Sequence, residues 1–156
     1  MIIICKDKNI CLKRIYFISA VIVFLCGIAI YTFFRNLNIV LFQYIPKPLF
    51  LDSLYIPVKQ KNIFIMMFLY NLPDGLWFLS GLLLIRTIWL DNHRWRLIYF
   101  IIFSFIALTI EISQLFAAVP GTFDLFDIVF MAFFAFLESV IFKRLFKNVP
   151  EFLIKR

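Results

Sequence analysis

The sequence contains few charged residues. They make up 16% of its 156 residues, and only nine residues are acidic, whereas about 25% of the residues in a soluble domain are charged. Hydrophobic residues account for 64% of the chain and aromatic residues for 20%, which is more than one small core can bury. This composition excludes an ordinary soluble domain and indicates a protein that has lipid as the solvent for much of its surface.

Cysteine and histidine are scarce as well. The three cysteines, Cys5, Cys11 and Cys26, are odd in number and match no metal-binding spacing, and His93 is the single histidine. We therefore expect free structural thiols rather than a disulfide. The sequence also lacks a Ser-His-Asp set, a zinc-binding spacing and a phosphate-binding loop. These observations predict no cofactor and no metal-binding motif.

The net charge of the chain is +7. In a soluble protein this excess would suggest nucleic acid as a partner. Here the basic residues stand at the ends of apolar runs, where lysine and arginine anchor membrane helices on the cytoplasmic side. We therefore predict membrane lipids as partners and no nucleic acid.

Four apolar segments determine the predicted fold. Residues 15–34, 72–90, 95–116 and 124–142 are each expected to cross the membrane, because about 20 helical residues span a bilayer. The first segment follows basic residues, as in a signal peptide, but it exceeds the roughly 7–15 residues of a signal-peptide core and no cleavage site follows. The prediction is an all-α membrane protein, a four-transmembrane-helix bundle formed by a single membrane domain over residues 1–156.

The stretch between the first two segments is less regular. Residues 37–71 contain three prolines between positions 46 and 57, which break any helix, and aromatic side chains that suit an outer loop on the membrane surface. Residues 63–70 are apolar but short, and Pro73 follows them. We favour a helix that begins near Leu72, with residues 63–70 interfacial or re-entrant. The alternative is one long helix kinked at Pro73.

The distribution of basic residues predicts the orientation. They cluster in residues 6–14, 94–96 and 143–156, whereas the turn at residues 117–123 contains no lysine or arginine. Positive charge favours the cytoplasmic side, so both termini and residues 94–96 are predicted to lie inside and the turn outside. The basic residues dispersed through residues 35–61 run against this orientation.

Polar residues interrupt the apolar pattern around the last turn. Glu111 and Gln114 share one helix face, as do Asp124 and Asp127, because residues three apart are neighbours on a helix. On the predicted topology all four lie near the outer surface, at the depth of Asp74. Ionisable residues in membrane segments are functional candidates, and crowded carboxylates favour a proton or a cation between them. We predict an outward-facing acidic pocket suited to a proton, a metal cation or a cationic head group.

A structural interpretation of the same residues stays open. Thr122 or Asp124 can cap the fourth segment, Asp124 and Asp127 can polarise its start, and Asp74 can cap and polarise the start of the second segment. Glu111 can pair with Arg35 at the end of the first segment.

Two further charged residues lie toward the predicted inner ends of their segments. Arg86 in the second segment and Glu138 in the fourth fall at similar depth. We predict a structural ion pair between them rather than a second site. His93 stands alone in a hydrated hinge and is a weak candidate for a ligand.

The pattern Glu111-x-x-Gln114, a short turn and Asp124-x-x-Asp127 resembles the VanZ-like family. Its members are small, mostly four-helix bacterial membrane proteins, named for a member of glycopeptide-resistance clusters that lowers sensitivity to teicoplanin. The resemblance covers residues 71–142.

This chain differs from the family pattern in three places. Residues 120–122 read Pro-Gly-Thr where the family often has an arginine, and residues 128–136 supply two alanines where the family has an asparagine and glycines. Residues 72–75 lack the lysine and histidine that the family often carries there.

The resemblance implies a multi-pass protein of the bacterial plasma membrane. Its acidic pocket would bind a cell-wall, lipid or glycopeptide component. One alternative is an intramembrane enzyme in which Glu111 or Asp127 acts as acid or base, with or without a divalent cation. Another is a structural membrane subunit whose polar residues only hold helices together. We favour binding over catalysis.

Overall fold

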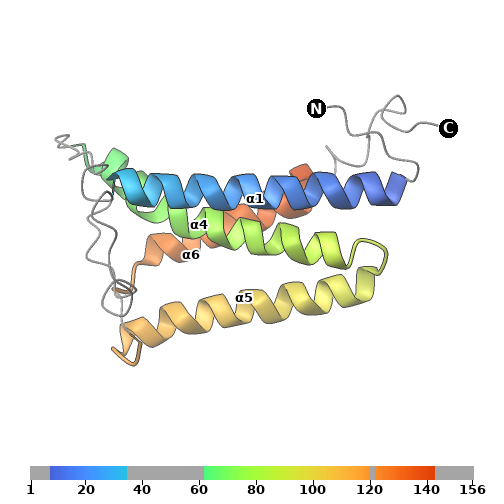
Figure 1. Ribbon diagram of the computed structural model, residues 1–156. Coiled ribbons are helices and arrows are strands. Elements are labelled where there is room, and N and C mark those ends of the chain that lie inside the picture. The colour runs from blue at the N-terminus through green and yellow to red at the C-terminus, as the bar shows by residue number, and fades with distance from the viewer. Residues whose placement is uncertain (1–7, 35–61, 120–121, 143–156) are drawn as a thin grey trace, which may run out of the picture.

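The computed structural model describes residues 8–34, 62–119 and 122–142, and these are helical apart from short turns (Figure 1). The elements are α1 (Lys8–Phe34), α4 (Ile63–Ile88), α5 (His93–Leu115), α6 (Leu125–Leu137) and the π-helical turn η1 (Glu138–Phe142). The predicted all-α class is confirmed. Helices consecutive in the described chain run antiparallel, and α4 contacts α1, α5 and α6.

Three of these helices are long and apolar enough to cross a membrane. They comprise Asn9–Phe34 of α1, Ile65–Ile88 of α4 and His93–Leu115 of α5. Only 11% of the residues in the most apolar part of α1, and 6% in that of α5, are buried inside the protein. Apolar surface exposed on this scale needs lipid around it. By length and composition, the chain is therefore a helical membrane protein.

The helix α4 forms the centre of the molecule. The buried core consists of Tyr16, Ala20, Leu79, Leu83 and Phe134, from α1, α4 and α6. The hydroxyl of Ser80 donates a hydrogen bond to the Ala20 carbonyl across the α1–α4 contact, at 3.0 Å. At Gly27 of α1, an added Cβ would lie 2.6 Å from the Trp77 indole. Small residues thus let the two helices approach closely.

The predicted start of the second helix near Leu72 is wrong. Helix α4 begins at Ile63 and runs without a break to Ile88, so residues 63–70 are neither a re-entrant segment nor part of an outer loop. The alternative of one long helix through Pro73 is the observed arrangement. The rest of the predicted outer loop, up to residue 61, lies outside the described residues.

Tertiary packing explains why Pro73 does not end the helix. A proline inside a helix removes one backbone hydrogen bond, but membrane helices tolerate this where neighbours support the backbone. Pro73 is fully buried, and its carbonyl lies against Gly27 of α1. Two residues earlier, Asn71 Nδ2 donates a hydrogen bond to the Met67 carbonyl at 2.8 Å. Packing against α1 therefore overrides the local signal for a break.

The other predicted boundaries lie closer to those observed. The first helix begins at Lys8 rather than at residue 15, so the basic residues Lys13 and Arg14 belong to the helix. Helices α5 and α6 begin within two residues of the predicted positions, and α6 with η1 ends at Phe142 as expected.

The two later helices contact α4 differently. Helix α6 lies close against it, because an added Cβ on Gly75 would lie 2.6 Å from the Phe134 ring. Helix α5 contacts α4 through Phe103, whose ring stacks on Phe78 with centroids 5.4 Å apart. Beyond that contact α5 diverges from α4 (Figure 1).

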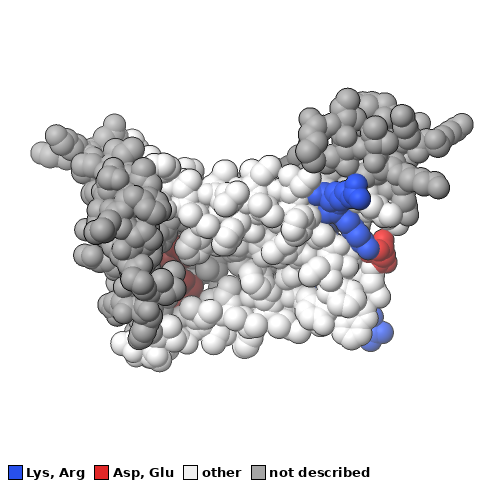
Figure 2. Space-filling view, viewed as in Figure 1, with Lys and Arg blue, Asp and Glu red and all other residues white. Residues whose placement is uncertain are grey.

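Charged groups gather at both ends of the helices. The basic end contains Lys13, Arg14, Arg94 and Arg96, and the acidic end contains Asp74, Glu111, Asp124 and Asp127. At the basic end, Lys13 forms an ion pair with Asp91 in the α4–α5 turn. Figure 2 shows charged atoms of both signs at one end and further acidic atoms toward the other. The start of α1 and the α4–α5 turn thus lie together, as the predicted topology requires.

Candidate functional site at the acidic end

Glu111 is the least expected residue of the acidic end. It lies in the last turns of α5, where every other residue is exposed or half-buried, yet only 7% of its surface is accessible. Its Oε2 atom is buried and accepts no hydrogen bond from any described residue. A buried carboxylate oxygen without such a partner is costly. Glu111 is therefore a candidate functional residue.

Two more carboxylates lie near Glu111, at positions outside α5. Asp74 in α4 and Asp124 at the start of α6 both lie close enough to act electrostatically on it. Both charges are negative, so neither compensates the Glu111 carboxylate. The structure thus brings Asp74 and Asp124 within electrostatic reach of Glu111.

Asp124 has a structural role in addition. It is the N-cap of α6, and its Oδ1 accepts a hydrogen bond from the Phe126 amide at 2.9 Å. A side-chain oxygen at this position satisfies one of the free amide groups of the first turn. The predicted cap is confirmed, and the same contact fixes the Asp124 carboxylate near Glu111.

Asp127 lies in the first turn of α6 and is 8% exposed. A carboxylate there is favoured by the positive end of the helix dipole. Its helical spacing places it on the same face as Phe130 and Phe134, the face that meets α4 at Gly75. Asp127 therefore belongs to the α4–α6 side of the acidic end.

The predicted capping role of Asp74 is wrong. Because α4 begins at Ile63, Asp74 lies in the helix interior, half-buried one turn from Asn71. A carboxylate there has no part in starting the helix. The predicted pairing of Glu111 with Arg35 cannot be placed, because Arg35 lies outside the described residues.

Gln114 stands one turn after Glu111, at the end of α5, and is half-buried. The backbone carbonyl of Gln114 accepts a hydrogen bond from the Ala117 amide at 3.0 Å. The backbone carbonyl of Ser113 accepts one from the Ala118 amide at 2.9 Å. This pair of bonds is a Schellman motif. Ala117 takes the left-handed conformation that the motif requires, with φ of 53°. Sequence inspection misses the motif because the position holds alanine instead of glycine.

The spacing of the acidic groups bears on what they can bind. Within the described ranges, no three side chains of Asp, Glu, His or Cys are placed to hold one metal ion together. Crowded carboxylates favour a proton or a cation between them.

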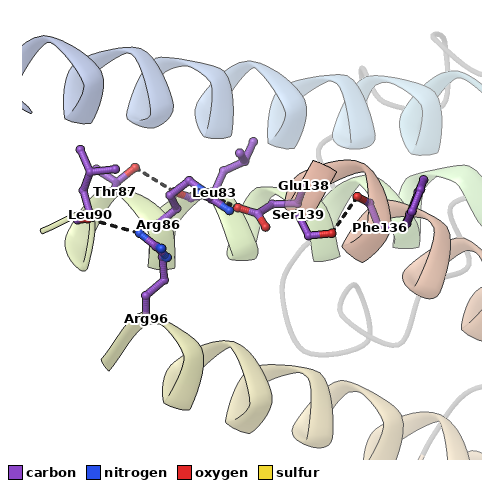
Figure 3. A network of polar contacts seen from close by, with 8 residues as sticks. All are labelled: Leu83, Arg86, Thr87, Leu90, Arg96, Phe136, Glu138 and Ser139. Carbon is purple, nitrogen blue, oxygen red and sulfur yellow. Dashed lines mark hydrogen bonds and ion pairs between the residues drawn. The ribbon is translucent and has the colours of Figure 1, made fainter. Parts of the chain in front are cut away.

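The basic end contains a second polar cluster. The predicted ion pair is confirmed: Arg86 Nε donates to Glu138 Oε1, with side chains 9% and 1% exposed. The Arg86 guanidinium also lies 5.6 Å from the centre of the Tyr16 ring. Figure 3 shows the pair between α4 and η1, with Arg96 of α5 reaching toward Leu90. Sequence inspection did not assign Arg96 to this cluster, because only the fold brings it close.

Comparison with known proteins identifies no relative. No protein-family model matches the chain, and neither curated proteins nor solved structures give a match. The function is therefore inferred from the geometry of the site and from the motif in residues 111–127.

Proposed function

We propose that the chain is a VanZ-like integral membrane protein of the bacterial plasma membrane, and that its acidic end binds a positively charged group of a cell-envelope component. That component is a cell-wall precursor, a lipid or a glycopeptide. The observation that supports this most strongly is the burial of the Glu111 carboxylate within electrostatic reach of Asp74 and Asp124. Ionised carboxylates so placed repel one another, and a cationic group between them relieves the repulsion.

The motif that carries the resemblance supports the proposal. Glu111 and Gln114 end α5, whereas Asp124 and Asp127 begin α6, and all four belong to one end of the molecule. Residues of a binding site must converge in space, and Asp74 joins this group from α4. The shared location is what a binding function requires.

The proposed membrane arrangement has four crossings. Helix α6 and η1 together run from Leu125 to Phe142, about 27 Å at 1.5 Å per residue, close to the roughly 30 Å of a bilayer core. They accompany the three long apolar helices as the fourth crossing. With the basic end in the cytoplasm, the acidic end faces outward.

The test replaces acidic side chains of the acidic end with uncharged amides of nearly the same shape. The full chain, expressed in a teicoplanin-sensitive Gram-positive host, is expected to raise the minimum inhibitory concentration of teicoplanin. Glu111→Gln and Asp74→Asn should abolish the increase while accumulating in the membrane at the wild-type level. Asp91→Asn is the matched control, because that carboxylate lies at the basic end and pairs with Lys13.

Direct binding completes the test. Calorimetry of the purified chain with teicoplanin should show binding at least about tenfold weaker for Glu111→Gln, because removing one partner of a buried charge pair costs about 2 kcal/mol or more. Retention of resistance and binding by Glu111→Gln would contradict a role for the acidic end. Failure of both variants to accumulate would favour the structural-subunit interpretation, and a wild-type chain with no effect on teicoplanin would rule out the glycopeptide.

A further inference from the structure

A cavity of about 170 Å³ lies at the basic end, between α4, the start of α5 and η1. Arg86, His93 and Arg96 line it, together with Glu138, Leu97 and Phe100. His93 and Leu97 are exposed, so the cavity opens to the surface, whereas Arg86 and Glu138 close its inner side. It lies at the opposite end of the helices from Glu111 and is independent of the proposed function.

The cavity has an excess of positive charge. Arg86 and Glu138 neutralise each other through their ion pair. Within the described part of the chain the guanidinium of Arg96 forms no ion pair of its own, although the Glu138 carboxylate acts on it electrostatically. Arg96 Nη1 donates one hydrogen bond, to the Leu90 carbonyl at 3.2 Å. A guanidinium has five N–H donors in a fork that matches a phosphate group. The Leu90 contact positions the fork and leaves donors for a ligand.

The start of α5 adds to the positive electrostatic potential in the cavity. The helix begins at His93, directly beside the cavity, and has no acidic residue in its first turn. The N-terminal end of a helix carries partial positive charge and favours phosphate groups. Two independent sources of positive potential thus meet at one cavity.

The surroundings indicate a lipid as the source of the phosphate. Trp89 stacks on Tyr99 at 5.2 Å and lies 5.9 Å from Trp95, and aromatic groups of this kind mark the membrane–water interface. From the cavity, an exposed apolar face of α5 continues through Leu97, Ile101 and Phe105. Acyl chains can lie along that face while the head group occupies the cavity.

From this geometry we infer that the cavity binds the phosphate of an anionic phospholipid head group. The Arg96 guanidinium makes the main contact with the phosphate, and Arg86 and the start of α5 add positive electrostatic potential. The acyl chains lie along α5 from Leu97 onward. Basic pockets between membrane helices near the cytoplasmic surface bind such head groups in other proteins.

The experiment measures lipid retention by native mass spectrometry. The purified full chain in detergent is titrated with phosphatidylglycerol and, separately, with phosphatidylcholine that has the same acyl chains. We expect the wild type to retain phosphatidylglycerol preferentially. Arg96→Gln should weaken that retention about tenfold, because a charge-assisted phosphate contact is lost. Arg94→Gln should leave it unchanged, because Arg94 is exposed in the same turn but does not line the cavity.

A further variant and a competition with inorganic phosphate complete the experiment. Arg96→Lys keeps the charge without the fork and should retain the lipid at an intermediate level, which covers the case in which Arg96→Gln does not fold. An equal loss for Arg94→Gln and Arg96→Gln would show diffuse surface charge and overturn the proposal, as would no loss for either Arg96 variant. Displacement of the lipid by an equal concentration of inorganic phosphate would assign the cavity to free phosphate and overturn the lipid.

Discussion

At Ala117 the backbone adopts a left-handed conformation, with φ of 53°, and no other non-glycine residue in the described ranges does so. Glycine usually occupies this position of a Schellman motif because it has no Cβ to clash with the backbone. An alanine there costs about 1 kcal/mol. The strained residue lies between Glu111 and Asp124, so the turn that joins two parts of the acidic end stores a small amount of strain, as functional sites often do.

We expect Ala117→Gly to stabilise the protein by about 0.5–1 kcal/mol, because glycine adopts a positive φ without a clash. Thermal unfolding of the purified chain in detergent measures the effect as a higher Tm. Ala118→Gly is the matched control, since Ala118 is exposed in the same turn and has no positive φ. Equal shifts for the two variants would show that the left-handed conformation at Ala117 carries no strain.

Among the elements, α6 depends most on a single close contact. At Gly75 of α4 the Phe134 ring occupies the space that a Cβ would need, at 2.6 Å. Phe134 is 6% exposed and cannot swing into free space. The contact fixes the distance between α4 and α6, and therefore between Asp74 and Asp127.

Gly75→Ala is expected to destabilise the protein by about 1–3 kcal/mol, because the added methyl group overpacks a filled contact. The double variant Gly75→Ala with Phe134→Leu should recover much of the loss, because leucine vacates the ring position. Thermal unfolding of the two single variants and the double variant in detergent measures this coupling. Additive losses would mean that the glycine contact does not set the helix spacing.

The sequence predicted these elements where local chemistry determines them. The apolar runs predicted the helices, and Asp124 before an apolar run predicted the α6 cap. The start of α4 was missed because Pro73 signals a break locally, while its burial against α1 is a property of the fold. Ala117 gives no signal for its conformation, and Arg96 joins Arg86 only through tertiary packing. Local patterns identified the acidic residues, but the burial of Glu111 required the structure.

Taken as a whole, the molecule separates its charges along the helix direction. The pairs Lys13–Asp91 and Arg86–Glu138 lie toward one end, and the cluster around Glu111 lies at the other. The positive-inside rule then predicts opposite sides of the membrane for the two ends.

Cysteine labelling tests this orientation. After replacement of Cys5, Cys11 and Cys26, the variant Thr122→Cys should react with a membrane-impermeant maleimide in intact cells, because Thr122 is exposed at the acidic end. The variant Arg94→Cys, exposed at the basic end, should react only after the cells are permeabilised. The reverse pattern would place the acidic end in the cytoplasm and contradict the proposed outward site.

In the proposed membrane arrangement, the divergence of α5 from α4 leaves lipid in contact with the helix that carries Glu111. Past the contact of Phe103 with Phe78, α5 carries Glu111 along a stretch whose apolar side chains are mostly exposed. In that arrangement, we expect the lipid beside α5 to influence how far Glu111 lies from Asp74. The acyl-chain length and the lateral pressure of the bilayer would then change the affinity of the acidic end for its ligand. We expect the same protein to bind its cell-envelope ligand with different affinities in nanodiscs of thin and of thick bilayers.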